Sequence, residues 1–187
     1  MTATASQARE LLAHHGTCSA QIADDWTGEI PIPDDIARFY AEVGPRDIEI
    51  VGYANPTFIP SLSELWNRQA GYRWNGLTGE PIADWPDSWI VVADEGADPY
   101  IFDSDTRRVL FAQHGTGEWD AGEIYPDLNT MAACIATLGI VISEADDFTD
   151  DDFLVQPKYR DMAVARLTDL LGITTEAEAI VTTAGWG

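Results

Sequence analysis

Acidic side chains that could support chemistry gather in the middle of the chain, at Asp94, Glu95, Asp98, Asp103 and Asp105. Two carboxylates in unequal environments can divide the roles of general acid and general base, as in many hydrolases. Calcium binding is not indicated, because the spacing departs from the D-x-[DN]-x-[DN]-G pattern of calcium loops. Asp side chains also stabilise turns by bonding to backbone N–H groups. We therefore interpret these carboxylates mainly as turn and strand-end residues, and a hydrolase is the weakest hypothesis.

Histidine and cysteine offer little further chemistry. None of His14, His15 and His114 lies beside a Ser or Cys in a nucleophile-elbow pattern such as G-x-S-x-G. Cys18 and Cys134 are far apart and belong to no CxxC or Cys/His cluster, so neither a disulfide framework nor a zinc site is indicated. Pairing of a cysteine with His114 in space stays open as an alternative. We expect buried thiols, no metal and no cofactor.

Tryptophan is the other residue type that could form a site, because indoles line ligand cages and anchor protein partners. Trp66 and Trp89 lie in apolar patterns and are assigned to the core. The other candidates lie in loops rich in Gly, Pro or acidic residues; they are Trp26, Trp74, Trp85 and Trp119. Burial is slightly favoured even for these, but we retain Trp74 and Trp85 as candidate partner anchors.

The charge balance limits the partners. The chain has 32 acidic and 10 basic residues, for a formal charge of -22, which argues against nucleic-acid binding and favours a basic protein partner. The densest acidic segment consists of Glu144, Asp146, Asp147, Asp150, Asp151 and Asp152. A solvated charge run is one interpretation. Because Phe148 and Phe153 interrupt it, we favour a segment pinned to the domain that presents its carboxylates as a defined surface.

Local patterns predict the elements that carry these residues. Helical spacing is found over residues 6–15, 33–43, 61–66, 128–138 and 158–171, with a short helix after Thr175. Strand patterns cover residues 48–50, 89–93, 100–102 and 109–112. Ser61 with Glu64, and Thr175 with Glu178, match the capping box that starts a helix. Turns are expected at 103–106 and 114–117.

The order of these elements indicates an α+β class: a single domain over 1–187 with a mainly antiparallel central sheet and helices packed on it. The uniformly apolar residues 89–93 predict a central strand. A helical C-terminal extension is expected over about 143–187. No basic stretch followed by an apolar run and no membrane-length apolar segment is found, so we expect a cytoplasmic protein that does not bind membranes.

Three segments carry a resemblance to a known family. Residues 32–40, Ile-Pro-Asp-Asp-Ile-Ala-Arg-Phe-Tyr, open a Pro-led helix with an acidic first turn that closes on Gly44. Residues 93–99, Ala-Asp-Glu-Gly-Ala-Asp-Pro, join two strands by a Gly-Asp-Pro-like turn, and a hairpin, Trp119 and a helix from Leu128 follow. Over about residues 22–140 the chain resembles the SUKH superfamily, specifically its Smi/Knr group. Ala97 departs from the pattern, in which Gly usually precedes the Asp, so we expect the turn to differ locally.

The resemblance implies an α+β fold and, as in bacterial members, immunity to a co-encoded toxin, often a nuclease or deaminase. Other members are regulatory interaction proteins, so a regulatory or scaffolding module is the alternative. Both roles are binding roles without catalysis. We expect the partner, a basic protein toxin, to be bound through acidic surface. Its candidate contacts are Asp94, Glu95 and Asp98, the 146–152 segment, and Trp74 or Trp85 as anchors. The oligomeric state is left open.

Overall fold

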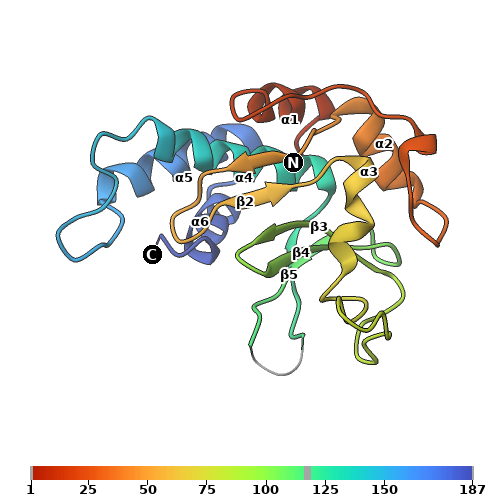
Figure 1. Cartoon of the computed structure of the whole chain (residues 1–187). Helices are drawn as coiled ribbons and strands as arrows, with labels where there is room; N and C mark the ends of the chain where they lie inside the picture. The colour runs from red at the N-terminus through yellow and green to blue at the C-terminus, as the bar shows by residue number, and fades with distance from the viewer. Residues whose placement is uncertain (1, 116–118, 187) are drawn as a thin grey trace.

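The computed structural model describes residues 2–115 and 119–186, and their fold is of the predicted α+β class (Figure 1). The turn expected at 114–117 therefore lies partly outside the described residues. The sheet consists of β1 (Ile48–Ile50), β2 (Thr57–Ile59), β3 (Trp89–Glu95), β4 (Asp98–Asp103), β5 (Arg108–Phe111) and β6 (Gly122–Tyr125). Each strand pairs in antiparallel fashion with the next one along the chain, so β3 and β4 occupy the centre. The predicted central position of residues 89–93 is confirmed.

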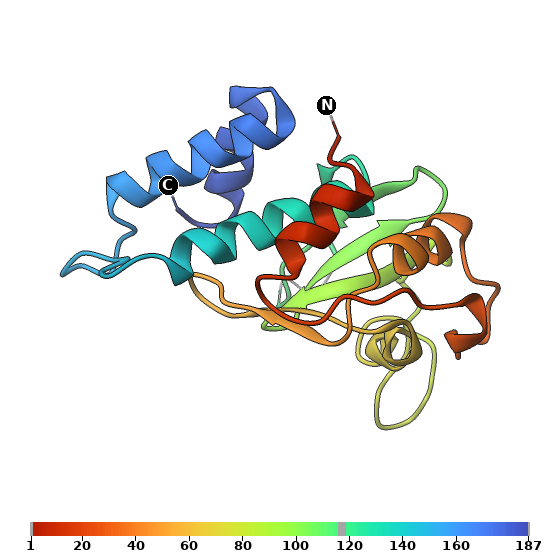
Figure 2. The same ribbon diagram turned by 90° about the horizontal axis from the view of Figure 1, so that it is seen from above.

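The helices pack mainly on one face of this sheet (Figure 2). They are α1 (Ala5–Leu12), α2 (Asp34–Glu42), α3 (Leu62–Leu65), α4 (Leu128–Ser143), α5 (Pro157–Leu171) and α6 (Thr174–Thr183), with 3-10 turns η1 (Ala23–Asp25) and η2 (Asn67–Gln69). Helix α4 contacts the sheet, α1 and α5, while α5 packs on α6 as the predicted C-terminal extension. Among the described residues, no helix combines the length and apolar character needed to cross a membrane.

The opposite face of the sheet carries a smaller apolar cluster. Its buried members are Trp85, Val91, Ile101 and Ala112. Partly buried side chains from the segment between η2 and β3, including Tyr72 and Ile82, cover it. Both faces of β3 are therefore buried, which explains why this strand is uniformly apolar.

Helix α4 extends beyond the end predicted at residue 138. It begins after Asp127, whose carboxylate accepts a hydrogen bond from the Thr130 N–H at 2.7 Å, and it continues through Gly139 to Ser143. A Cβ atom at position 139 would lie 2.3 Å from Ile50 Cγ2. Gly139 is therefore not a stop signal, because its role is to let the helix approach strand β1 closely.

Two predicted capping boxes are wrong. The Ser61 side chain does not cap α3, because its hydroxyl donates to Asp47 Oδ1 at 3.0 Å instead. Helix α6 begins at Thr174 after Ile173 and has no side-chain cap, so Thr175 lies inside its first turn. In both cases the local pattern is present, but the tertiary fold uses the residue differently.

The β3–β4 turn is formed by Gly96 and Ala97, both with positive φ angles of 61° and 81°. This left-handed region is favourable for glycine and costs an alanine roughly 1–2 kcal/mol. The Ala97 backbone is therefore strained at this turn.

Gln69 supplies hydrogen-bond partners for the backbone of β3 at Val91, where strand β2 does not pair with it. It is fully buried, with 0% of its surface exposed. Its side-chain Nε2 donates to the carbonyl oxygens of Val91 (2.9 Å) and Leu65 (2.8 Å), and its Oε1 accepts from the Val91 N–H (2.9 Å). Strand β2 pairs with the far end of β3, at Asp94 and Glu95. The Gln69 amide thus takes the place of a neighbouring strand at Val91.

We predict that Gln69→Leu destabilises the fold by about 2–5 kcal/mol, because each buried backbone group left without a partner costs about 1–3 kcal/mol. Urea denaturation followed by circular dichroism measures this loss. Gln113→Leu, at an exposed position, is the matched control and should change stability by less than about 0.5 kcal/mol. Equal stability of the two variants would contradict the role assigned to Gln69.

Candidate binding site

A cavity of about 240 Å³ opens beside the β3–β4 turn, between the end of the sheet and the C-terminal helices. The segment 51–55 between β1 and β2 forms one wall, and strands β4 to β6 with helices α4 and α6 form the rest. Two of the predicted site residues, Glu95 and Asp98, line it. The cavity therefore lies at the end of the sheet where the sequence places an acidic surface.

Glu95 and Asp98 have different environments in this cavity. Glu95 Oε2 accepts a hydrogen bond from the Tyr100 hydroxyl at 3.3 Å. Burial raises the pKa of Glu95; the Tyr100 hydrogen bond opposes this effect, and the nearby Asp98 charge adds to it. Asp98 Oδ1 accepts from the His114 N–H at 2.7 Å and lies 2.6 Å from His114 Nδ1. Asp98 thus stabilises the segment after β5, whereas a turn residue is expected to bond to backbone N–H groups of its own turn.

Asp94 lies on the other face of the sheet. Its Oδ2 is 3.8 Å from Arg68 Nη1, and the Arg68 guanidinium lies over the Phe58 ring at 4.0 Å. Burial raises the pKa of Asp94, and the Arg68 charge opposes this effect. Burial and then the Asp94 and Asp98 charges raise the pKa of Tyr72 to about 12. Successive residues of a strand face opposite ways, so the structure separates Asp94 from Glu95.

The remaining carboxylates of the central group do not join this site. Asp103 lies at the opposite end of β4 from Asp98 and accepts hydrogen bonds from Asp105 N–H (3.1 Å) and the Thr106 hydroxyl (2.8 Å). These bonds stabilise the β4–β5 turn.

In the part of the chain that the structure describes, the cysteines and the other potential metal ligands form no site of their own. Burial raises the pKa of the Cys134 thiol. Within residues 2–115 and 119–186, no group of three or more His, Cys, Asp or Glu residues is placed to hold a metal ion.

The two candidate tryptophan anchors differ in accessibility. Trp85 is 6% exposed and donates its indole N–H to the Trp89 carbonyl oxygen at 3.1 Å, so it belongs to the smaller core cluster and not to a binding surface. Trp74 is partly exposed and packs against Trp66, with ring centroids 5.1 Å apart. Trp74 therefore remains available for contact with a partner, whereas Trp85 is too buried to be a partner anchor.

The acidic segment is fixed to the domain through Phe148. The Phe148 ring packs on Trp186 (4.9 Å between centroids), Tyr159 (5.8 Å) and Tyr53 (6.0 Å). The prediction that both aromatics pin the segment is wrong for Phe153, whose side chain is 79% exposed. Phe153 contributes through its backbone instead, since its carbonyl oxygen accepts from the Tyr53 hydroxyl at 2.6 Å.

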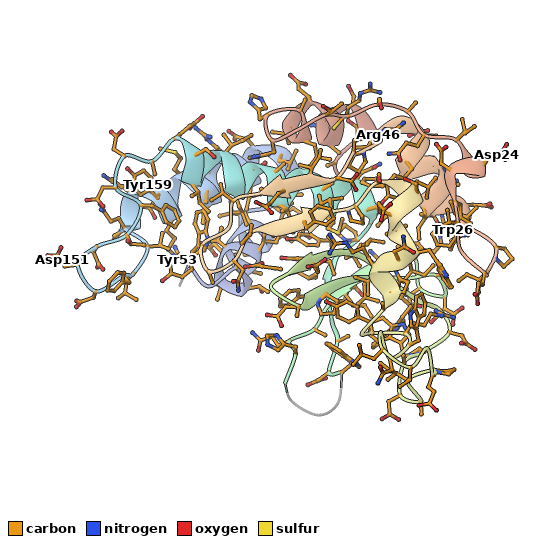
Figure 3. All side chains as sticks on the ribbon, viewed as in Figure 1. Asp24, Trp26, Arg46, Tyr53, Asp151 and Tyr159 are labelled. Carbon is orange, nitrogen blue, oxygen red and sulfur yellow. The ribbon has the colours of Figure 1, made fainter. Side chains whose placement is uncertain are left out.

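Asp150 organises the tip of this segment. Its Oδ1 accepts from the backbone N–H groups of Asp152 (3.0 Å) and Leu154 (2.9 Å). The side chains of Asp146, Asp147, Asp151 and Asp152 are exposed. Figure 3 places Asp151 at the outer end of the segment, while Tyr53 and Tyr159 lie nearer the helices. The carboxylates therefore project from a segment with a defined base.

The cavity and the acidic segment are neighbours. Tyr53 and Trp186 line the cavity, and both also pack on Phe148 at the base of the segment. Tyr125 completes the cavity wall from β6. Sequence analysis missed these three residues, because no local motif distinguishes them.

Comparisons of the chain with protein-family models, curated proteins and solved structures found no match.

We predict that Phe148→Ala lowers the free energy of unfolding by about 2–4 kcal/mol, since it removes a ring packed among three aromatic neighbours. The change should also increase hydrogen exchange of amides in residues 146–156. Phe153→Ala is the matched control and should alter stability by less than about 0.5 kcal/mol. Equal effects of the two changes would show that Phe148 does not fix the segment.

We also predict that Glu95→Gln stabilises the protein at pH 7. A raised pKa in the folded state means that the stability contributed by Glu95 is present below its unfolded pKa of about 4.3 and is lost as the pH rises through the folded value. The Gln side chain does not ionise, so the variant does not lose this stability as the pH rises. Urea denaturation should give a higher unfolding free energy for the variant at pH 7 and a smaller difference at pH 4. Glu49→Gln, at an exposed position on β1, should show no such pH-dependent gain.

Proposed function

We propose that the chain is a non-catalytic binding protein of the SUKH superfamily, Smi/Knr group, which neutralises a protein toxin in the cytoplasm. The toxin class proposed is one that acts on nucleic acid, a nuclease or a deaminase. Such a toxin needs a basic cleft to hold phosphates, and an acidic protein can occupy that cleft in their place. The motifs of residues 32–44 and 93–99 and the charge of -22 support this proposal.

The observation that carries the proposal is the fixed base of the acidic segment. Exposed carboxylates on a disordered tail would lose conformational entropy on binding, whereas carboxylates on a packed segment have already lost much of it. The Phe148 contacts and the Asp150 hydrogen bonds supply this order. The exposed Phe153 and Leu154 at the same tip add apolar surface that a partner can bury.

Electrostatic attraction accounts for fast association in this proposal. Complementary charge raises association rates from about 10⁵–10⁶ to about 10⁸–10⁹ M⁻¹s⁻¹ at low salt. The gain shrinks as salt screens the field, with a Debye length of about 8 Å at physiological ionic strength. Affinity then depends on a few buried contacts, for which Phe153 and Leu154 at the tip of the segment are the candidates.

The partner can be identified by a pull-down from the native cell, read by mass spectrometry. Recovery of a basic toxin encoded directly upstream of this gene is the result expected. A regulatory or scaffolding role is the second candidate, suggested by the partly exposed Trp74, whose segment between η2 and β3 lies far from the acidic segment (Figure 1). Recovery of a host protein with no toxin gene beside this one would favour that role.

We predict that replacing Asp147, Asp151 and Asp152 together by Lys slows association with the toxin about tenfold or more at low salt and flattens its salt dependence. Asp150 is kept, because its carboxylate bonds to the backbone of the tip. Stopped-flow or surface-plasmon measurements across salt concentrations give the rates.

The matched control replaces three other exposed residues, Glu10, Asp24 and Glu29, by Lys. It changes the net charge by the same amount as the first variant. Asp24 and Asp151 lie at opposite ends of the molecule (Figure 3). The control should slow association less than the first variant. If both variants associate at the same rate, the segment has no special role in docking, and net charge alone determines the attraction.

A further inference from the structure

The cavity beside the β3–β4 turn is lined by a tyrosine, Tyr125, that the surface docking proposed above does not use. Tyr125 lines the cavity and is 2% exposed. Among the described residues, none is hydrogen bonded to its hydroxyl group, whereas the neighbouring Tyr100 hydroxyl donates to Glu95. The Tyr125 hydroxyl is therefore available for a hydrogen bond to a polar group of a ligand in the cavity.

The charge of the cavity indicates the sign of that ligand. Glu95 and Asp98 contribute two carboxylates to the lining; Asp98 is paired with His114 Nδ1 at 2.6 Å, and none of the described lining residues is Lys, Arg or His. Glu95 is half-buried, and its partners are the neutral Tyr100 hydroxyl and the Asn55 backbone, so none of the described lining residues supplies a cation to it. A buried carboxylate is most stable beside a positive charge. The ligand that fits is a cation.

The other walls indicate what carries the positive charge. The rings of Tyr53, Tyr100, Phe111 and Trp186 line the cavity, and aromatic rings attract ammonium and guanidinium groups through their faces. The wall from α4 is aliphatic and includes Ile135 and Leu138. A hydrated metal ion would make poor use of these apolar surfaces. At about 240 Å³ the cavity is also smaller than the roughly 300–1,000 Å³ of drug-sized ligand pockets.

We propose that this cavity binds a small organic cation, in which an ammonium or guanidinium group is carried on a short apolar chain. The charged group donates to Glu95 and to the Tyr125 hydroxyl, and the apolar chain packs along Ile135 and Leu138. This site is separate from the toxin-binding role, because it uses residues that line the cavity and not the exposed carboxylates of the acidic segment.

Butylguanidinium is a suitable probe, and isothermal titration calorimetry with the full chain in about 0.15 M NaCl measures its binding. Salt at this concentration screens the general attraction between the acidic protein and any cation. Saturable binding of one equivalent is expected, with butylammonium also binding. Butanol and butyrate test the charge, and neither should bind. Absence of saturable binding of both cations, or equal binding of butanol, would overturn the proposal.

Three variants locate the bound cation. Glu95→Gln should weaken butylguanidinium binding about tenfold or more, because a hydrogen bond to a charged group is lost. Tyr125→Phe should weaken it about threefold to tenfold with the fold intact. Asp94→Asn removes the same charge one residue away, on the other face of the sheet, and should change affinity less than twofold.

Circular dichroism establishes that each variant is folded, and Tyr125→Phe carries the test if Glu95→Gln is not. Equal losses for Asp94→Asn and Glu95→Gln would mean that the cation responds to overall charge and not to this cavity, which contradicts the proposal. A negative result here leaves the toxin experiments unaffected, since those depend on exposed residues of the acidic segment.

Discussion

The unpaired edge of β3 is the constraint around which this fold is organised. A buried strand needs a partner for each backbone polar group, and β2 reaches only the far end of β3. Side chains fill the gap: Gln69 bonds to both backbone groups of Val91, and the Trp89 carbonyl oxygen accepts from Arg73 Nη1 (3.1 Å) and the Trp85 indole. The Gly- and Pro-rich segment before β3 thus covers one face of the sheet. Its residues Arg73 and Trp85 stabilise the strand by donating hydrogen bonds to it.

The other face of the sheet leads to the candidate sites. There the α4 helix lies against the strands, and the C-terminal helices close the space at the end of β3 and β4. Phe148 packs on Tyr53 and Trp186, which are also cavity residues, so the acidic segment and the cavity share one set of aromatic contacts. A substitution at Phe148 therefore affects both the acidic segment and the cavity. The two proposals concern different atoms, but the same packing positions them.

Local patterns predicted the fold class, the central strand and the position of Glu95 and Asp98 at one end of the sheet. These follow from apolar periodicity and turn residues, which are properties of neighbours in sequence. The separation of Asp94 from Glu95 also follows from strand alternation, although sequence analysis grouped them. Gln69 and Tyr125 could not be found this way, because their roles depend on atoms far away in the chain.

The position of α1 has a consequence for the order in which the chain folds. The meander can form from hairpins as each strand emerges, since successive strands are neighbours. Helix α1, by contrast, packs on α4, and the Ala3 N–H bonds to Thr130 Oγ1 at 3.1 Å. At about 5–20 residues per second, synthesis reaches α4 roughly 6–25 s after α1. During that interval Ala8 and Leu12 lack the α4 surface that buries them, so α1 is covered long after it is synthesised.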